Sequence, residues 1–155
     1  MDIFWFRLYP VEILNDFANL SPMYKITKTF TFCYGHRLYK DPGKCGHVHG
    51  HTGRTEITLS GKKLNDLGML MNFDEMKSGI GKWIDDNLDH RMLMNRSDPL
   101  ARLLSEEGEK LFLMDSNPTA ENIARTIFSV AKESGLPIES VTFWESPTAF
   151  ASYEG

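Results

Sequence analysis

Residues 24–34, YKITKTFTFCY, alternate between apolar and polar side chains, with Lys28 as the exception on the apolar parity. One parity carries the large apolar and aromatic side chains Tyr24, Ile26, Phe30, Phe32 and Tyr34. The other parity carries Lys25 and a series of threonines. A period of two is typical of a β-strand with one face on a core and the other in water. Residues 52–60, TGRTEITLS, predict a second such strand with Ile57 and Leu59 on its inner face.

The segment between these strands predicts a long antiparallel hairpin. Residues 41–46, DPGKCG, have the composition of a turn. Two alternating segments joined by a glycine-containing turn are the pattern of paired neighbouring strands.

The rest of the chain adds helices and one more strand. Asp74 is predicted to cap a helix with apolar residues at helical spacing: Met76, Ile80, Trp83, Ile84 and Leu88. Residues 98–109 predict a short helix, and a longer one is predicted to start with Asn117 as N-cap and to end at Gly135. Residues 138–146 predict a final strand. This order indicates an α+β fold with helices on one side of an antiparallel sheet.

Residues 45–51, CGHVHGH, place one cysteine and three histidines in seven positions. His49 and His51 share one face of the second strand, because side chains two apart point the same way. His36 has the inner parity of the first strand, and a hairpin folded about residues 42–44 brings it opposite residues 49–51. Three neutral imidazoles with one open position are the ligand set of a catalytic zinc site. Spacing alone leaves open whether His47 and His49, or His49 and His51, are the pair that binds.

Cys45 has two interpretations. As a fourth ligand it would close a structural zinc site. The turn offsets it from the face of His49 and His51, which favours the alternative. In this alternative Cys45 is a catalytic base: a thiol near the metal and beside Lys44 ionises to a thiolate that can accept a proton. Cys33 is assigned no role.

Two carboxylates are further candidates. Asp89 directly precedes His90, and a carboxylate so placed can orient an imidazole and stabilise its charged form. Glu145 has the parity of Val141 and Phe143, so the pattern places an acid on an apolar face, where it needs a partner. That partner is either a lysine or arginine or a ligand with an amidine-like pair of N–H groups.

The composition fits one globular domain: 155 residues, of which 41% are hydrophobic and 25% charged. A net charge of -4 argues against nucleic-acid binding. Two cysteines favour a reducing, cytoplasmic location over a disulfide-stapled secreted domain. Residues 1–22 fit neither a signal peptide nor a membrane span, and are predicted to be an N-terminal extension before a domain of residues 23–155.

Six motifs occur in the order found in one known superfamily: FTFCYGHRL, CGHVHGH, GMLMNFDEMK, LDHRMLMN, PTAENIA and VTFWES. Over about residues 23–147 the chain resembles the 6-pyruvoyltetrahydropterin synthases. The resemblance implies the tunnelling fold, a four-stranded antiparallel sheet with two main helices on one face. It also implies subunits that close into a trimeric barrel and stack as a homo-hexamer.

The resemblance implies a substrate, 7,8-dihydroneopterin triphosphate, and a cofactor, zinc. The implied zinc ligands are His36, His49 and His51, which leaves His47 outside the ligand set. Cys45 would be the catalytic base, with Asp89 and His90 as its proton-handling partners. Zinc would acidify the hydroxyls and neighbouring C–H bonds of the substrate side chain.

The pterin ring has its own implied contacts. Glu145 would bind the amino-pyrimidinone edge, and Thr119 would lie close by. Two departures from the family pattern stand out. Gly53 occupies a position where many relatives carry an aromatic residue, and Asn72 one where the carboxy-forming branch often has Asp.

The position of Cys45 favours the 6-carboxytetrahydropterin synthase branch, which serves queuosine and 7-deazaguanine biosynthesis. In the animal pyruvoyl-forming enzymes the cysteine lies six residues before the first histidine of HGH, whereas here the gap is four. The implied products are 6-carboxytetrahydropterin, acetaldehyde and triphosphate. Formation of 6-pyruvoyltetrahydropterin, or a non-catalytic zinc- or pterin-binding role, are the alternatives.

Overall fold

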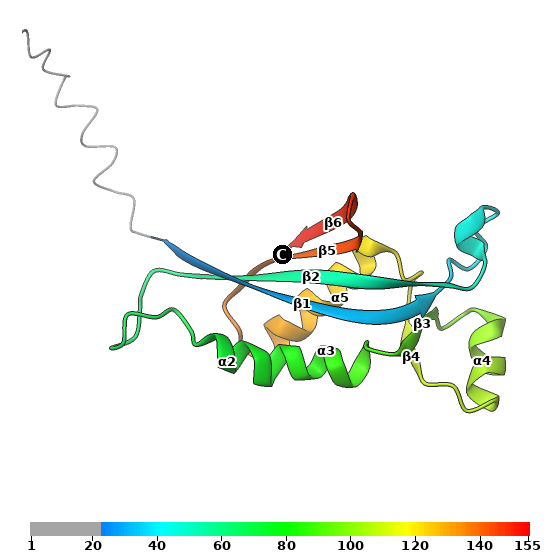
Figure 1. Cartoon of the computed structure of the whole chain (residues 1–155), viewed down its shortest axis with the longest axis horizontal. Coiled ribbons are helices and arrows are strands. Elements are labelled where there is room, and N and C mark those ends of the chain that lie inside the picture. Colours follow the sequence, from blue (N-terminus) through cyan, green and yellow to red (C-terminus); the bar gives the residue numbers. More distant parts are fainter. Residues whose placement is uncertain (1–22) are drawn as a thin grey trace, which may run out of the picture.

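The computed structural model describes residues 23–155 (Figure 1). The strands are β1 (Tyr24–His36), β2 (His49–Gly61), β3 (Arg91–Asn95), β4 (Leu111–Met114), β5 (Ile138–Ser146) and β6 (Ala149–Glu154). The helical elements are η1 (Lys44–Gly46), α2 (Phe73–Met76), η2 (Lys77–Gly81), α3 (Lys82–Asn87), α4 (Pro99–Glu106) and α5 (Ala120–Glu133). The predicted N-terminal extension, residues 1–22, lies outside the described residues.

One sheet contains all these strands, in the order β4-β3-β1-β2-β5-β6. The predicted hairpin is confirmed: β1 and β2 pair antiparallel, with His36 opposite His49 and Tyr34 opposite His51. The strands β1, β2, β5 and β6 form the expected four-stranded antiparallel arrangement.

The predicted strand number of four is too low for the sheet as a whole. Strands β3 and β4 extend it through parallel pairing, β3 against β1 and β4 against β3. They are only five and four residues long, and their sequences RMLMN and LFLM lack the apolar–polar alternation that marks a strand exposed on one face.

The helices cover one face of this sheet, as predicted for an α+β fold. In Figure 1, α2 and α3 run along one side of the long β1–β2 ribbon, with α5 on the same side. The core joins residues of the sheet and of the helices, among them Phe32, Ile57, Met76, Ile84, Ile127 and Val141. The other face is polar, with cross-strand hydroxyl pairs such as Thr27 and Thr58 at 2.9 Å. No helix within residues 23–155 is long and apolar enough to cross a membrane.

Two predicted helix starts are wrong by two residues. The side chain of Asn72, not that of Asp74, caps the first helix by accepting the N–H of Asp74 at 2.9 Å. Asn and Asp are equally good N-caps, so Asn72 preserves a cap where the carboxy-forming branch often has Asp. Thr119 rather than Asn117 caps α5, because residue 119 still has an extended backbone and the helix begins only at Ala120.

Gly53, the other departure from the family pattern, lies beneath aromatic rings. A Cβ at this position would lie 2.6 Å from Cζ of Phe143 and 3.1 Å from Cε1 of Tyr34. Both distances are shorter than van der Waals contact. The rings of Phe143 and Tyr34 therefore occupy the space into which a side chain at residue 53 would point.

Two glycines of η2 give a matched test of how closely this helix packs against the sheet. A Cβ on Gly81 would lie 2.5 Å from Cε1 of Phe30, whereas a Cβ on Gly79 would meet no atom of the described part of the chain, residues 23–155, within 4 Å. We expect Gly81→Ala to lower the free energy of unfolding by roughly 1–3 kcal/mol, because the core must shift to admit a methyl group. Gly79→Ala should raise it by about 0.5–1 kcal/mol through reduced backbone entropy. Urea denaturation of both variants checks the pair, and a stabilised Gly81→Ala would contradict the packing.

Candidate metal and acid–base site

Three histidines from the two paired strands converge at the end of the β1–β2 ribbon. The ligand atoms of His36, His49 and His51 all lie within 4.8 Å of one another. Their ring centroids are 4.5 to 5.1 Å apart. His36 is only 2% exposed, whereas His49 and His51 are half-buried. The ladder register creates this cluster, since it sets His36 directly opposite His49.

The hydrogen bonds of the rings define which nitrogens are free. Nδ1 of His36 lies 2.8 Å from the carbonyl oxygen of Pro118, and Nδ1 of His49 lies 2.7 Å from that of His47. A carbonyl only accepts, so in the neutral rings the proton is on Nδ1 and Nε2 carries a lone pair. The two Nε2 atoms face each other at 3.0 Å. Two lone pairs at this distance repel, and a cation between the rings removes the repulsion.

His51 adds a third ring nitrogen that a bound cation would stabilise. Its Nε2 is buried and has no hydrogen-bond partner within the described residues. The nearest carboxylate oxygen, Oε1 of Glu145, is 3.7 Å away, too far for a hydrogen bond. The three imidazoles thus fit a metal ion that prefers nitrogen ligands, and zinc is the ion most often held by such a set.

Burial favours the neutral form of His36. Desolvation lowers the pKa of His36 below its ordinary value, against the opposing effect of the Pro118 carbonyl. A neutral imidazole is the form that binds a metal. Tyr34 packs edge-on against His36, with ring centroids 5.0 Å apart. Burial, and secondarily the charge of Glu145, raise the pKa of Tyr34 so that its hydroxyl stays protonated.

Glu145 lies beside the cluster, as its parity predicted. It is on β5 next to Trp144, which pairs with Arg54 of the neighbouring β2. The Glu145 side chain is 29% exposed. No lysine or arginine within residues 23–155 forms an ion pair with it, so its one charged neighbour there is His51 if that ring is protonated. A carboxylate in this position is available to a ligand.

Cys45 lies in the connection between the two ligand-bearing strands. It is a half-buried free thiol in the short η1 turn, and its carbonyl oxygen accepts the N–H of Leu38 at 2.7 Å. It belongs to no group of metal-ligating side chains found within residues 23–155, whereas the three histidines do. This arrangement favours the prediction in which Cys45 is not a ligand.

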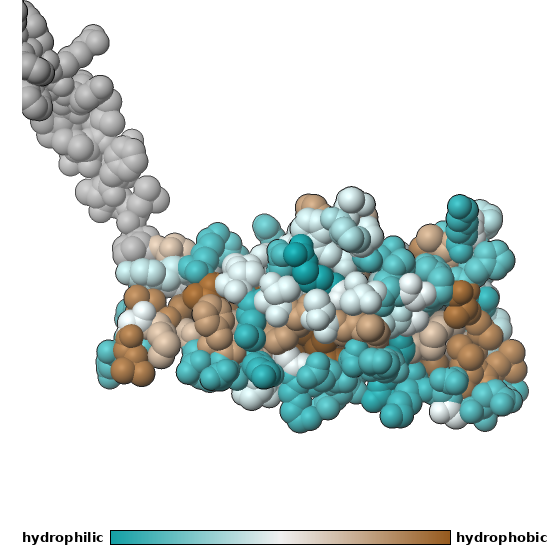
Figure 2. Space-filling model, viewed as in Figure 1, coloured by the Kyte–Doolittle hydropathy of each residue, from teal (hydrophilic) through white to brown (hydrophobic). Residues whose placement is uncertain are grey.

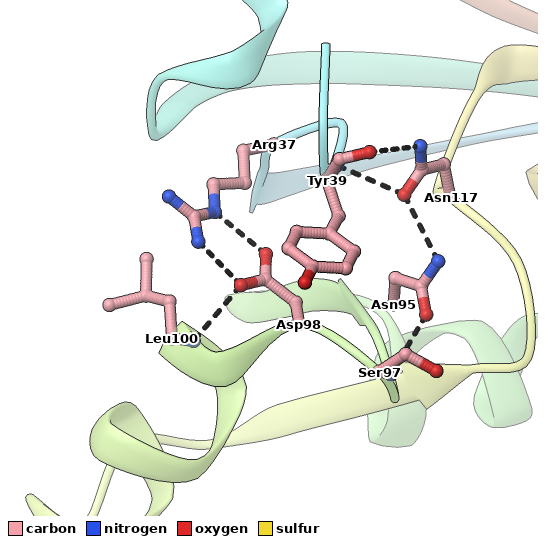
Figure 3. A network of polar contacts seen from close by, with 7 residues as sticks. All are labelled: Arg37, Tyr39, Asn95, Ser97, Asp98, Leu100 and Asn117. Carbon is pink, nitrogen blue, oxygen red and sulfur yellow. Dashed lines mark hydrogen bonds and ion pairs between the residues drawn. The ribbon is translucent and has the colours of Figure 1, made fainter.

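The connection is also attached to α4. Arg37, directly after His36, forms a two-pronged ion pair with the fully buried carboxylate of Asp98, with Nε 2.7 Å from Oδ2 (Figure 3). Asp98 also caps α4 through the N–H of Leu100. The hydrogen bonds from Arg37 lower the pKa of Asp98 below its ordinary value, although burial opposes this. Arg37 is therefore engaged within the fold.

Asp89 and His90 form the predicted pair, but on the other side of β1. Nδ1 of His90 is 2.7 Å from Oδ2 of Asp89, and the N–H of Cys33 donates to Oδ1 of Asp89. Burial opposes ionisation of Asp89, yet these hydrogen bonds hold its pKa below the ordinary value. Strand β3, which His90 precedes, pairs with β1 on the edge away from β2. Among the described residues, no hydrogen bond or ion pair joins this pair to the three histidines.

Sequence reasoning missed the carbonyl groups that orient the rings. Pro118 is adjacent to Thr119, whose side chain is occupied in capping α5 by accepting the N–H of Asn122. The carbonyl of Pro118 is a ligand-orienting group that no side-chain pattern reveals. The motif PTAENIA offered a partial indication, because it marked the segment that the fold brings against His36.

Comparison with known proteins identifies a family to which nearly the whole described part of the chain corresponds. A family model described as 6-pyruvoyl tetrahydropterin synthase matches residues 25–155. The chain belongs to the 6-pyruvoyl tetrahydropterin synthase family. The match includes both ligand-bearing strands, the Asp89–His90 pair and Glu145, so all candidate site residues lie within the family domain.

Relatives within the family cover most of the chain. The 6-carboxy-5,6,7,8-tetrahydropterin synthase of Haemophilus influenzae is 36% identical over 140 residues, spanning 85% of this chain and 99% of the relative. The enzyme of the same name from Aquifex aeolicus is 28% identical over 159 residues. A 6-pyruvoyl tetrahydrobiopterin synthase of Dictyostelium discoideum is 32% identical but spans only 58% of this chain.

Solved structures share the fold. An uncharacterized protein from Wolinella succinogenes superposes with a TM-score of 0.71 at 25% identity, covering 87% of this chain and 99% of that one. The 6-pyruvoyl tetrahydropterin synthase of Caenorhabditis elegans gives a TM-score of 0.67 at 23% identity, covering 86% and 96%. The tunnelling fold expected from the sequence motifs is therefore confirmed.

The assignment of His49, and not His47, to the three-histidine cluster predicts that alanine substitutions at these two positions affect zinc binding differently. We expect His49→Ala to lose bound zinc, because it removes one of three converging nitrogens. His47→Ala should retain zinc near one ion per chain, because only the backbone carbonyl of residue 47 touches the cluster. Metal content after gel filtration in metal-buffered solution checks both variants. Equal loss in the two would contradict the assigned ligand set.

Proposed function

We propose that this protein is a zinc-dependent synthase that acts on 7,8-dihydroneopterin triphosphate. The observation that carries the proposal is the convergence of His36, His49 and His51, two of them with Nε2 atoms 3.0 Å apart, beside the carboxylate of Glu145. Membership in a family of tetrahydropterin synthases supports the substrate class.

The proposed product is 6-carboxy-5,6,7,8-tetrahydropterin. Relatives with this name cover most of the chain, and the four-residue gap between Cys45 and His49 supports the same branch. In the proposed reaction, substrate and one water give 6-carboxytetrahydropterin, acetaldehyde and triphosphate. Formation of 6-pyruvoyltetrahydropterin would release triphosphate without consuming water or forming acetaldehyde. The product would enter queuosine or 7-deazaguanine biosynthesis.

Zinc, when bound, would act as a Lewis acid toward the side-chain hydroxyls of the substrate. Pro118 and His47 would keep the rings of His36 and His49 in the tautomer that leaves Nε2 free. Cys45 would accept a proton from the substrate side chain. Asp89 would keep His90 oriented as a proton donor or acceptor.

The pterin ring would bind through Glu145. Two adjacent N–H groups of an amino-pyrimidinone match the two oxygens of a carboxylate, and such charge-assisted hydrogen bonds are stronger than neutral ones. Glu145 is exposed enough to be reached and has no lysine or arginine partner within residues 23–155. Thr119 would lie close to the pterin ring, since capping α5 uses one acceptor position of its hydroxyl and leaves the O–H to donate.

Assembly of several subunits would bring the proposed acid–base residues Cys45, Asp89 and His90 together. Strands β4 and β6 are the two edges of the sheet in one chain, and Leu113 on β4 and Phe150 on β6 are exposed by 38% and 56%. Figure 2 shows apolar residues gathered over the α4 and β4 end of the molecule. Unpaired apolar edges favour closure against other subunits. A homo-hexamer built from two trimeric rings could bring Asp89 and His90 of one subunit to Cys45 of another.

Product analysis tests the reaction. Zinc-loaded protein is incubated with 7,8-dihydroneopterin triphosphate, the pterin is identified by mass, and acetaldehyde is measured with alcohol dehydrogenase and NADH. We expect one acetaldehyde for each triphosphate. Triphosphate without acetaldehyde would assign the pyruvoyl-forming reaction, and bound pterin without turnover would assign a binding protein.

A pair of cysteine variants tests the role of Cys45 in the same assay. Cys45→Ser should reduce turnover by about 10²–10⁴-fold, the usual contribution of a general base, with zinc content unchanged. Cys33→Ser is the matched control and should be fully active, because Cys33 lies on the polar face of β1. Undiminished turnover in Cys45→Ser would remove the thiol from the mechanism.

A further inference from the structure

The connection between β1 and β2 controls where Cys45 lies relative to the histidines. It starts directly after His36 and ends directly before His49. Within it, the N–H of Leu38 donates to the carbonyl of Cys45 at 2.7 Å, so the two arms of the connection are joined at that point. Whatever fixes the arm near Leu38 therefore also fixes Cys45.

Besides the ion pair of Arg37 with Asp98, a contact of Asn117 holds this arm (Figure 3). The N–H of Tyr39 donates to Oδ1 of Asn117 at 3.0 Å, and Nδ2 of Asn117 donates to the carbonyl oxygen of Tyr39 at 3.0 Å. One carboxamide thus pairs with both polar groups of one backbone residue, as a neighbouring strand would. Tyr39 is the residue next to Leu38, so the contact acts one peptide away from the hydrogen bond to Cys45.

A second asparagine sets the orientation of the Asn117 carboxamide. Nδ2 of Asn95 donates to Oδ1 of Asn117 at 3.1 Å, and Oδ1 of Asn95 accepts the N–H of Ser97 at 2.9 Å. Since the backbone N–H of Ser97 can only donate, the amide of Asn95 has one orientation, and it presents a donor to Asn117. Three of the four hydrogen-bonding positions of the Asn117 carboxamide are used.

The backbone at Asn117 and Pro118 contacts the start of α5 and the ring of His36. The carbonyl of Asn117 accepts the N–H of Thr119 at 2.8 Å and Nδ2 of Asn122 at 2.9 Å, which fixes the start of α5. The next carbonyl, that of Pro118, accepts from Nδ1 of His36. The same residue is thus tied through its side chain to the connection that carries Cys45, and through its backbone to the group that orients His36.

We propose that Asn117 is a positioning residue of this site, which sets the thiol of Cys45 relative to the three histidines without touching metal or substrate. The inference rests on the proposed function only in taking the histidines as metal ligands and Cys45 as a catalytic residue. Asp at this position would place an oxygen against the carbonyl of Tyr39, and Gln would extend the amide by one methylene. The geometry therefore requires Asn.

The experiment compares Asn117→Ala and Asn117→Asp with Asn65→Ala as a matched control. Asn65 also holds a connection through its side chain, accepting the N–H groups of Leu67 and Met69, each at 3.0 Å. That connection joins β2 to α2 at the opposite end of the β1–β2 ribbon (Figure 1). The control therefore shows how far the loss of any loop-anchoring asparagine by itself changes the measured cobalt affinity and thiol reactivity.

Two measurements report on the site itself. Cobalt affinity, from competition with a chromophoric chelator, should fall by about 10- to 100-fold in Asn117→Ala, as for other groups that orient metal ligands. In a Cys33→Ser background, the reaction of Cys45 with a thiol reagent should become about fivefold faster, the factor that corresponds to one ordinary hydrogen bond. Asn65→Ala should change neither, and Asn117→Asp should shift both in the direction of Asn117→Ala.

The outcomes separate this inference from the proposed function. Unchanged cobalt affinity and unchanged thiol reactivity in a folded Asn117 variant would overturn the positioning role, whatever the wild-type protein catalyses. A wild-type protein that binds no cobalt would instead contradict the proposed metal site, and the thiol measurement would still test Asn117. If Asn117→Ala does not fold, Asn117→Asp carries the comparison.

Discussion

The register between β1 and β2 determines both which side chains enter the core and how the three histidines meet. Thirteen residue pairs, from Tyr24 opposite Gly61 to His36 opposite His49, fix which side chains face the helices. A slip of one residue would turn His49 and His51 to the polar face, together with Ile57 and Leu59. The buried side chains that hold the core together therefore also hold the three histidines in place, and the fold cannot keep one set without the other.

The site combines burial with directed backbone acceptors. A histidine that is nearly inaccessible to water favours its neutral form, and a carbonyl at Nδ1 leaves Nε2 free. This arrangement brings two nitrogen lone pairs into contact and leaves a buried nitrogen of His51 with no hydrogen-bond partner among residues 23–155, both of which cost free energy. These costs disappear when a cation binds, so metal binding should stabilise the native state as well as prepare it for chemistry.

The sequence predicted the parts of the fold that follow from the alternation of apolar and polar side chains. The β1–β2 hairpin and the inner face of Glu145 follow from a period of two. The period also brings His36 opposite residues 49–51, but the choice of His49 and His51 over His47 came from the family resemblance. Strands β3 and β4 could not be predicted, because short, apolar, parallel strands carry no alternation. The helix starts were missed by two residues, because several adjacent polar residues could serve as caps. The carbonyl of Pro118 and the pairing of Asn117 with Tyr39 depend on tertiary contacts between distant segments.

X-ray absorption at the zinc edge can distinguish a metal held by three imidazoles, with Cys45 free to react, from a metal that also binds Cys45. Zinc–nitrogen and zinc–sulfur bonds differ in length, at about 2.0–2.1 Å and about 2.3 Å. We expect nitrogen and oxygen scatterers alone, with the multiple scattering that imidazole rings produce. A sulfur scatterer at the longer distance in the resting protein would contradict it, because Cys45 would then be a ligand of a closed, structural site.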